Sequence, residues 1–253
     1  MLKLAADFSY DLKQICSLDV FGTRILGYFQ TYSDKFDFCT VWIQHDDSGK
    51  PSAAVSRVNG DITVCAGENA DYDELSAFVS MSDYASLQCQ KSVMNKLGLI
   101  SDTDGYVLRF NPGEYSDKDI SHTADFKEIY DIIKGAGLMG VGDYLPWLSD
   151  VTYRVNHGTA LPAVIAEDGG AVSCAMALFI TDEAALLGAV ATKNDYRGRG
   201  YAGRLVKYLG NKMTKQNKKT YLLCKQGSIF DFYESIGFEK EDEWSAITRR
   251  KNE

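Results

Sequence analysis

The chain has 253 residues, of which 45% are apolar and 25% charged, and its formal net charge is −8. These values are ordinary for a globular protein, and the acidic balance argues against a nucleic-acid-binding protein, which needs basic surface to neutralise phosphates. No apolar run approaches the roughly 18 residues of a membrane span. Residues 1–16 contain acids and lack the apolar core of a secretory signal. We therefore expect a cytoplasmic protein with no membrane or nucleic-acid partner, built as one large domain or two modest ones.

The first part of the chain predicts a helix followed by a run of strands. Apolar residues recur with helical spacing over 8–32. Strand-like runs follow at 38–45, 52–58 and 62–67, and the sequence Asn59-Gly60-Asp61 between the last two is a hairpin signal. The further elements expected here are a helix at 71–81 with Asp71 near its start, a strand at 85–89, a helix at 90–99 closed by Gly98, and a strand at 105–110.

A Pro/Gly/Asp-rich segment at 111–119 predicts a boundary between two domains, 1–117 and 118–253. The second part repeats the element order of the first. Its expected elements are helices at 123–137 (Thr123 as N-cap) and 143–158 (Pro146 in its first turn), strands at 160–167, 171–180 and 184–192, a helix at 200–216, a strand at 220–225, a helix at 228–237 and a strand at 244–250. The shared order predicts a mixed, mostly antiparallel α/β (α+β) sheet flanked by helices, built from two similar domains in tandem.

The cysteines and histidines predict neither disulfides nor a metal site. The six cysteines are far apart and lie mostly in apolar, strand-like runs: Cys16, Cys39, Cys65, Cys89, Cys174 and Cys224. We expect them to be buried reduced thiols. The three histidines, His45, His122 and His157, have no ligand spacing to a cysteine, so no metal is expected.

The strongest functional signal is the glycine loop "RGRGYAGR" at 197–204, directly before a predicted helix. A helix N-terminus offers unpaired backbone N–H groups and a partial positive charge, and glycines let this backbone approach a phosphate. Arg197 and Arg199 add positive charge and donors. The loop therefore predicts an anion site at the start of the helix, and the alternative is that the glycines merely shape a tight turn.

Two familiar nucleotide motifs fit this loop poorly. Gly198, Gly200 and Gly203 form G-x-G-x-x-G, but a dinucleotide fingerprint needs the first glycine at a strand end and an acid about 20 residues on. Here residues 193–197 separate strand from glycine, and the next strand ends in Lys225. A triphosphate loop requires Lys and Ser or Thr after its glycines, and this chain has Arg204 and Leu205 there.

A third sequence motif fits the glycine loop better. The segment "RGRGYA" matches [Q/R]-x-x-G-x-[G/A], is preceded by "VAT" (190–192), and is followed downstream by "FDFYESIGFEK" at 230–240. Together these closely resemble the acetyl-CoA-binding signature and the following F-Y-E-x-x-G-F segment of the GCN5-related N-acetyltransferase (GNAT) superfamily. The resemblance covers roughly residues 120–253. It implies a sheet whose fourth and fifth strands diverge, with the pantetheine arm of acetyl-CoA in the gap.

The resemblance also implies residue roles. The backbone of Val190, Ala191 and Thr192 would pair with pantetheine, and Tyr233 would protonate the departing CoA thiolate. The pyrophosphate would be held by the loop, that is Arg197, Gly198, Arg199, Gly200, Tyr201, Ala202 and Gly203. Gln226 stands where many members carry Asn and would make a similar amide contact. The acetyl group would pass directly to an amine in a ternary complex, with its carbonyl polarised by a backbone N–H and no cysteine nucleophile.

Two points stay open at this stage. No acid lies within the strands at 184–192 and 220–225, where many members keep the base that deprotonates the amine. Asp182, Glu183, Asp195 or His157 would have to serve, each with an ordinary surface or structural role as the alternative, or water would act instead. The acceptor, a small molecule or a peptide amine, is not identified by the sequence.

The first half lacks the glycine loop. At the corresponding place it has "AGENADYDEL", whose acids Glu68, Asp71, Asp73 and Glu74 would repel a pyrophosphate. We therefore interpret residues 1–117 as a degenerate GNAT-like domain that does not bind CoA and that packs against the second half. Its acids would attract a cationic amine or simply be solvated. For the whole chain, the alternatives to an acetyltransferase are a non-catalytic acyl-CoA binder and, less well supported, a nicotinamide-linked oxidoreductase.

Overall fold

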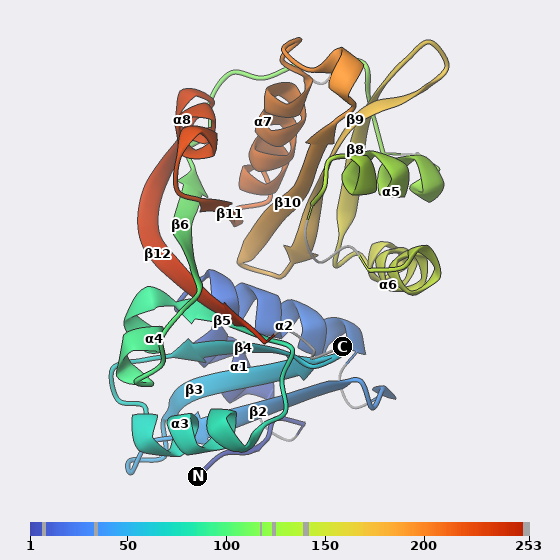
Figure 1. Cartoon of the computed structure of the whole chain (residues 1–253). Coiled ribbons are helices and arrows are strands. Elements are labelled where there is room, and N and C mark those ends of the chain that lie inside the picture. The colour runs from blue at the N-terminus through green and yellow to red at the C-terminus, as the bar shows by residue number, and fades with distance from the viewer. Residues whose placement is uncertain (7–8, 33–34, 117, 123–124, 139–141, 250–253) are drawn as a thin grey trace. The chain divides into compact units, whose positions relative to one another are not determined.

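The computed structural model describes residues 1–253 except 7–8, 33–34, 117, 123–124, 139–141 and 250–253. The chain forms two compact units (Figure 1). The first comprises Met1–Val107, Cys224–Gln226 and Lys240–Glu253, and the second comprises Leu108–Leu223 and Gly227–Glu239. Strands β6 (Thr103–Phe110), β11 (Lys219–Lys225) and β12 (Phe238–Thr248) therefore contribute residues to both units. The expected division into domains 1–117 and 118–253 stays a prediction.

The first unit is a mixed sheet with helices on both faces. Its elements are β1 (Lys3–Leu4), α1 (Ser9–Cys16), α2 (Val20–Tyr32), β2 (Cys39–His45), β3 (Pro51–Val58), β4 (Asp61–Ala66), α3 (Tyr72–Met81), β5 (Ser86–Gln90) and α4 (Lys91–Lys96). The strands hydrogen-bond in the order β1-β2-β3-β4-β5-β12. The β4–β5 pair is parallel, and the other pairs are antiparallel.

Side chains alternate between the two faces of this sheet, as the strand geometry requires. On one face Val55 and Val64 pack with Leu75 and Val79 of α3 and with residues of α4. On the other face the Cys65 thiol reaches the Ile15 carbonyl of α1 at 3.5 Å. Each face therefore has its own apolar contact with a helix layer, which is how a sheet of this size is covered.

The second unit repeats this architecture. Its elements are β7 (Ile120–Ser121), α5 (Phe126–Gly135), α6 (Tyr144–Asn156), β8 (Leu161–Glu167), β9 (Gly170–Ile180), β10 (Ala184–Thr192), the 3₁₀ turn η2 (Asn194–Tyr196), α7 (Tyr201–Thr214), β11 (Lys219–Lys225) and α8 (Ser228–Ser235). The strand order continues from β12 as β6-β11-β10-β9-β8-β7. The fold is thus mixed α/β, as the sequence predicts.

Helices α5 and α7 cover opposite faces of β8–β10 (Figure 1). Ile129, Ile132 and Ile133 of α5 pack on Cys174 and Met176 of β9, together with Val151 of α6. On α7 the buried residues recur at helical spacing, and they include Leu205, Val206, Leu209 and Met213. Strand β9 is buried almost throughout because it has a helix on each side.

Strands β10 and β11 pair over only part of their length. Their parallel register runs from Ala184–Lys219 to Leu187–Leu222 and ends there. Beyond this point β10 also departs from β9, because the register shifts between Gly188 and Ala191 and leaves Ala189 and Val190 without partner residues. Ala189 has a positive φ of 51°, so this part of β10 is a bulge.

The elements expected from the sequence are present, with three differences. The helix expected at 8–32 is two helices, because Asp19 ends the first and caps the second, accepting a hydrogen bond from Gly22 N–H at 2.8 Å. Strand β12 begins at Phe238, before the expected 244, since its charged first residues masked the strand pattern. Strands β1 and β7 and the turn η2 were not expected. The N-cap expected at Thr123 lies outside the described residues, and Asp125 caps α5.

All six cysteines are free and, as the sequence predicts, buried. Desolvation by burial raises the pKa of Cys39 and of Cys224 to about 11. Within the described parts of the chain, no helix combines the length and the apolar character that a membrane crossing requires.

The packing of α7 yields a stability prediction at Gly210. A Cβ at this position would lie 2.5 Å from the Phe110 ring, which is buried and packs at a tilt against Phe238 with ring centroids 5.1 Å apart. Alanine is favoured over glycine in a helix by about 1 kcal/mol, but overpacking a core costs about 1–3 kcal/mol. We therefore expect Gly210→Ala to lower the free energy of unfolding by up to about 2 kcal/mol, measured by denaturant titration.

The matched control is Gly135→Ala at the end of α5. A Cβ there meets no atom within 4 Å, so only the helix preference remains and this variant should be unchanged or slightly more stable. Equal stability of the two variants would contradict the packing argument.

Candidate functional site

The turn between β10 and α7 is built from glycines in a left-handed conformation. Gly198 has φ 77° and Gly200, the N-cap of α7, has φ 78°. Other residues pay about 1–2 kcal/mol to adopt this region. No side chain caps the N-terminus of α7, so its first backbone N–H groups face the loop with the positive end of the helix dipole.

This turn lines an open pocket of about 550 Å³ in the second unit. The pocket lies where the end of β10, the glycine turn, the start of α7, the end of α5 and helix α8 meet. Its lining residues are Ala136, Leu138, Val190, Ala191, Thr192, Tyr196, Arg197, Gly198, Gly200, Tyr201, Ala202, Gly203, Ile229, Phe232 and Tyr233. One end is therefore backbone-rich and basic, and the other is apolar and aromatic.

The pocket joins the bulged, unpaired end of β10 to the helix N-terminus. Ser173 of β9 fixes this end of the strand, because its hydroxyl donates to the Ala191 carbonyl at 3.0 Å and lies 2.8 Å from the Thr192 hydroxyl. Past Leu187 the edge of β10 that faces away from β9 is not paired with β11. An extended ligand could therefore bond to this edge as an added strand.

An acidic hairpin turn anchors the glycine loop. Glu167, at the end of β8, accepts a hydrogen bond from the Tyr201 hydroxyl and forms an ion pair with Arg199 at 3.1 Å. The hydrogen bond to Glu167 raises the pKa of Tyr201. Arg199 also stacks over the Tyr196 ring at 4.9 Å, and the Tyr196 hydroxyl donates to Asp168 at 3.3 Å. The loop is thus held by side chains before any ligand binds.

Tyr233 is fixed in an aromatic cluster on α8. It is buried, and its ring packs edge-on against Phe232 at 5.1 Å and Phe238 at 5.7 Å. Tyr233 also lines the pocket, so an aromatic residue that carries a hydroxyl contributes to its wall.

The pocket brings together most of the residues singled out by the sequence. Those that line it are Val190, Ala191, Thr192, Arg197, Gly198, Gly200, Tyr201, Ala202, Gly203 and Tyr233. Arg199 is bonded to Glu167 instead, and Gln226 is exposed and not among the lining residues. Whether any of these residues binds a cofactor stays a prediction.

Sequence reasoning missed part of the apolar wall. Ala136 and Leu138 follow α5, and Ile229 lies in the first turn of α8. Leu138 is 36% exposed and Ile229 44%, so both leave apolar surface open at the pocket. Their position could not be read from the sequence, because it depends on how α5 and α8 approach α7.

The four candidate bases lie outside the pocket lining. Asp182 and Glu183 precede β10, so they lie at the opposite end of that strand from Thr192. His157 is bonded to the Tyr153 carbonyl at 2.8 Å and stacks on the Tyr153 ring, so it closes α6. Asp195 lies in η2 and is exposed. Among the described residues lining the pocket there is no Asp, Glu or His.

Part of the chain matches a known protein family. Residues 160–240 match the family model described as an acetyltransferase (GNAT) domain. No curated protein sequence matches the chain. The chain therefore carries a GNAT domain at residues 160–240, from β8 to the start of β12.

Solved structures match over nearly the whole chain. A GCN5-related N-acetyltransferase from Sphaerobacter thermophilus is 16% identical with a TM-score of 0.59, covering 97% of this chain and 94% of that one. A GNAT-family acetyltransferase from Colwellia psychrerythraea is 10% identical (TM-score 0.60, 98% and 100% covered). A tandem GNAT protein from the clavulanic acid biosynthesis pathway is 12% identical (TM-score 0.56, 97% and 97% covered). At these identities the likeness establishes the fold.

The hydrogen bonds of Glu167 lead to a prediction about loop order. Glu167→Gln removes the negative charge that holds Arg199 and that accepts the hydrogen bond from Tyr201. We expect backbone amides of residues 197–203 to exchange with deuterium about tenfold faster in this variant. Asp168→Asn, which leaves both Glu167 bonds in place, is the control. Exchange in Glu167→Gln as slow as in the wild-type chain would show that Glu167 does not order the loop.

Proposed function

We propose that the GNAT domain at residues 160–240 makes this chain an acetyl-CoA-dependent N-acetyltransferase that transfers the acetyl group to an amine. The single observation that carries this proposal is the pocket in which an uncapped helix N-terminus, the unpaired end of β10 and Tyr233 line one cavity. The helix N-terminus would bind the pyrophosphate, the edge of β10 would bond to pantetheine, and Tyr233 would donate a proton to the leaving thiolate.

The glycine turn is the proposed pyrophosphate site. Backbone N–H groups from Gly198 to Gly203 and the dipole of α7 favour an anion, and the missing Cβ atoms of Gly198 and Gly200 allow close approach. A Cβ at either glycine would meet nothing within 4 Å. Packing inside the protein therefore does not require glycine at these two positions. Their left-handed backbone conformation favours glycine, and the absence of a side chain would let the pyrophosphate reach the backbone N–H groups.

The end of β10 is the proposed pantetheine site. The amide groups of pantetheine would bond to the backbone of Val190, Ala191 and Thr192 on the edge that β11 leaves open. The bulge at Ala189 and Val190 turns backbone groups out of the ladder with β9. One of these N–H groups would polarise the thioester carbonyl as negative charge develops on its oxygen.

Tyr233 is the proposed general acid. In the transfer, the amine nitrogen forms a bond to the thioester carbon, the carbon–sulfur bond breaks, and the thiolate takes the hydroxyl proton of Tyr233. A cysteine nucleophile is disfavoured, because desolvation raises the pKa of Cys174 to about 12 and that of Cys224 to about 11. Since no carboxylate or histidine is among the described lining residues, water is the proposed acceptor of the amine proton.

The first unit is proposed not to bind CoA. At the position that corresponds to the glycine turn of the second unit, the first unit has acidic residues whose carboxylates form hydrogen bonds and an ion pair within the protein. Asp71 caps α3 by accepting from the Glu74 N–H at 2.9 Å, and Glu74 accepts from the Leu2 N–H and from the buried Gln44 at 2.8 Å. Glu68 pairs with Lys96. The position is therefore negative and already filled by the protein's own groups.

The direct test is thermal unfolding of the purified chain with and without acetyl-CoA. A ligand at 100 times its Kd stabilises the folded state by about 2.7 kcal/mol, which raises the unfolding midpoint measurably. NAD is the control ligand, because the glycine loop lacks the dinucleotide context. No shift with acetyl-CoA, or an equal shift with NAD, would contradict the proposed pyrophosphate site.

Tyr233→Phe separates an enzyme from a non-catalytic acyl-CoA binder. The substitution keeps the aromatic packing and removes the hydroxyl, so acetyl-CoA should bind within about twofold of wild type while kcat falls about 100-fold or more. Thiol release with a panel of amines measures the rate. Tyr10→Phe, at an exposed tyrosine of α1, is the control. An unchanged kcat would remove Tyr233 from the chemistry, and a wild type that binds acetyl-CoA without turnover on any amine would favour the binder.

A further inference from the structure

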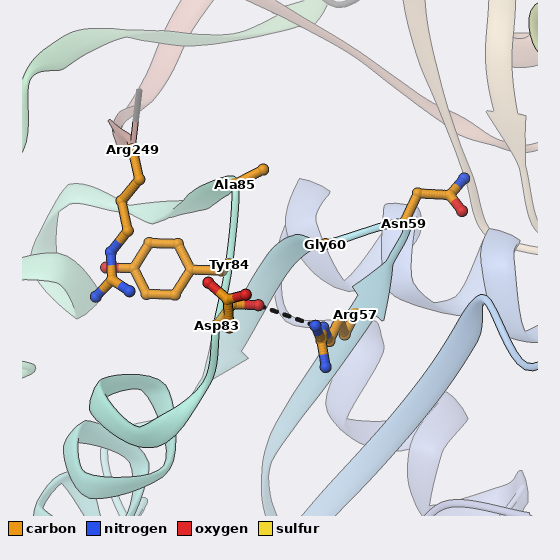
Figure 2. Close-up of a pocket in the computed structure, with 7 residues that line it drawn as sticks. All are labelled: Arg57, Asn59, Gly60, Asp83, Tyr84, Ala85 and Arg249. Atoms are coloured by element: carbon orange, nitrogen blue, oxygen red, sulfur yellow. Dashed lines mark hydrogen bonds between the residues drawn. The ribbon is translucent and has the colours of Figure 1, made fainter. Parts of the chain in front are cut away.

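The first unit contains a second open pocket, of about 430 Å³ (Figure 2). It lies where the β3–β4 turn, the segment before β5 and the end of β12 meet. Its lining residues are Arg57, Asn59, Gly60, Asp83, Tyr84, Ala85 and Arg249. The backbone here is well fixed, because Ala85 N–H donates to the Gly60 carbonyl at 2.8 Å and Arg249 N–H donates to the Ala85 carbonyl at 2.9 Å.

Arg249 is held flat against an aromatic ring. Its guanidinium carbon lies 3.7 Å from the centroid of the Tyr84 ring, and Tyr84 itself is only 4% exposed. Stacking covers one face of the guanidinium and leaves its in-plane N–H groups to donate elsewhere. This arrangement lowers the entropy that the long side chain would lose on binding an anion.

Arg57 is held at the other side of the pocket. One of its terminal nitrogens donates to the Asp83 carbonyl at 2.9 Å. Figure 2 shows Arg57 and Arg249 on either side of Asp83 and Tyr84. Both arginines line the same pocket, and each is positioned by a neighbour that does not neutralise its charge.

These two arginines differ from most others in the chain. Arg109, Arg154, Arg199 and Arg204 each form an ion pair with a carboxylate. Among the described residues, neither Arg57 nor Arg249 has a carboxylate partner within 4.0 Å. The chain has a net charge of −8, so carboxylates are available to pair with its arginines. Two arginines at one pocket without a carboxylate partner therefore indicate that the pocket binds an anionic ligand.

We infer that this pocket binds a small organic dianion, with a carboxylate or phosphate group for each arginine. Guanidinium groups match both anions in geometry. The Asp83 carboxylate also lines the pocket, so the part of the ligand between its anionic ends must be neutral or carry a donor such as a hydroxyl or amine. The site belongs wholly to the first unit, has no helix N-terminus, and does not depend on the proposed acetyltransferase activity.

Titration calorimetry on the full chain tests this site with succinate and 2-phosphoglycolate as probes. Succinamide, which has the length of succinate without its charges, is the matched control ligand. We expect both dianions to bind and succinamide not to bind. Arg57→Gln and Arg249→Gln should each weaken binding at least tenfold, and Arg249→Lys, which keeps the charge but loses the flat stacked fork, should lie between wild type and Arg249→Gln.

Two controls keep the result specific. Lys50→Gln, on the exposed β2–β3 turn of the same unit, removes an equal charge and should leave binding unchanged. Acetyl-CoA binding by the arginine variants should match wild type, which shows that they fold and separates the two sites. The inference is overturned if neither dianion binds at millimolar concentration, if succinamide binds equally, or if both Arg→Gln variants bind as wild type does.

Discussion

The divergence of β10 from β11 is the constraint on which the second unit depends. Backbone N–H and C=O groups are costly to leave unpaired in a protein interior, yet the two strands part at Leu187 and Leu222. At the bulge, Ala189 and Val190 have no register partner in β9, although the Ala189 carbonyl accepts a hydrogen bond from the Cys174 thiol at 3.5 Å. Val190 lines the pocket, where a ligand or solvent can satisfy its backbone groups. The same strand end leads into the glycine turn, so one irregularity provides both a backbone edge and a helix N-terminus.

The two units show how the same element order can serve opposite purposes. After β4 the first unit continues through acids into α3, and Asp71 caps that helix while Glu74 bonds to Leu2 and Gln44. After β10 the second unit continues through glycines into α7, whose N-terminus has no side-chain cap. A capped, acidic helix start is stable alone, whereas an uncapped one surrounded by arginines remains available to an anion. The two units thus share an element order, but the start of α3 is capped by a side chain and the start of α7 is not.

Local patterns in the sequence predicted the fold and most of the pocket lining, because strands, turn glycines and the tyrosine segment have short-range signals. Strand β12 was placed too late, since its first residues are charged and do not alternate clearly. The sequence also could not place Glu167 beside Arg199 and Tyr201, because that contact joins the β8–β9 turn to a loop far along the chain. For the same reason the Tyr84–Arg249 stack was invisible, and with it the second pocket. The contacts that the sequence did not predict join residues far apart in the chain, and hydrophobic periodicity contains no information about such contacts.

The absence of an acid or histidine among the described residues lining the pocket constrains the chemistry of the acceptor. An amine must lose its proton before it attacks, and a lysine-like amine with a pKa of about 10.4 is neutral in only about one molecule in 2,500 at pH 7. An α-amino group, with a pKa of about 7.7–8.0, is neutral in roughly one molecule in ten or more at that pH. With water as the proton acceptor, the proposed transfer therefore has about 200- to 400-fold more neutral amine available from an acceptor of low pKa. Charge on the protein does not reverse this preference, because a carboxylate that attracts the ammonium form also stabilises its proton.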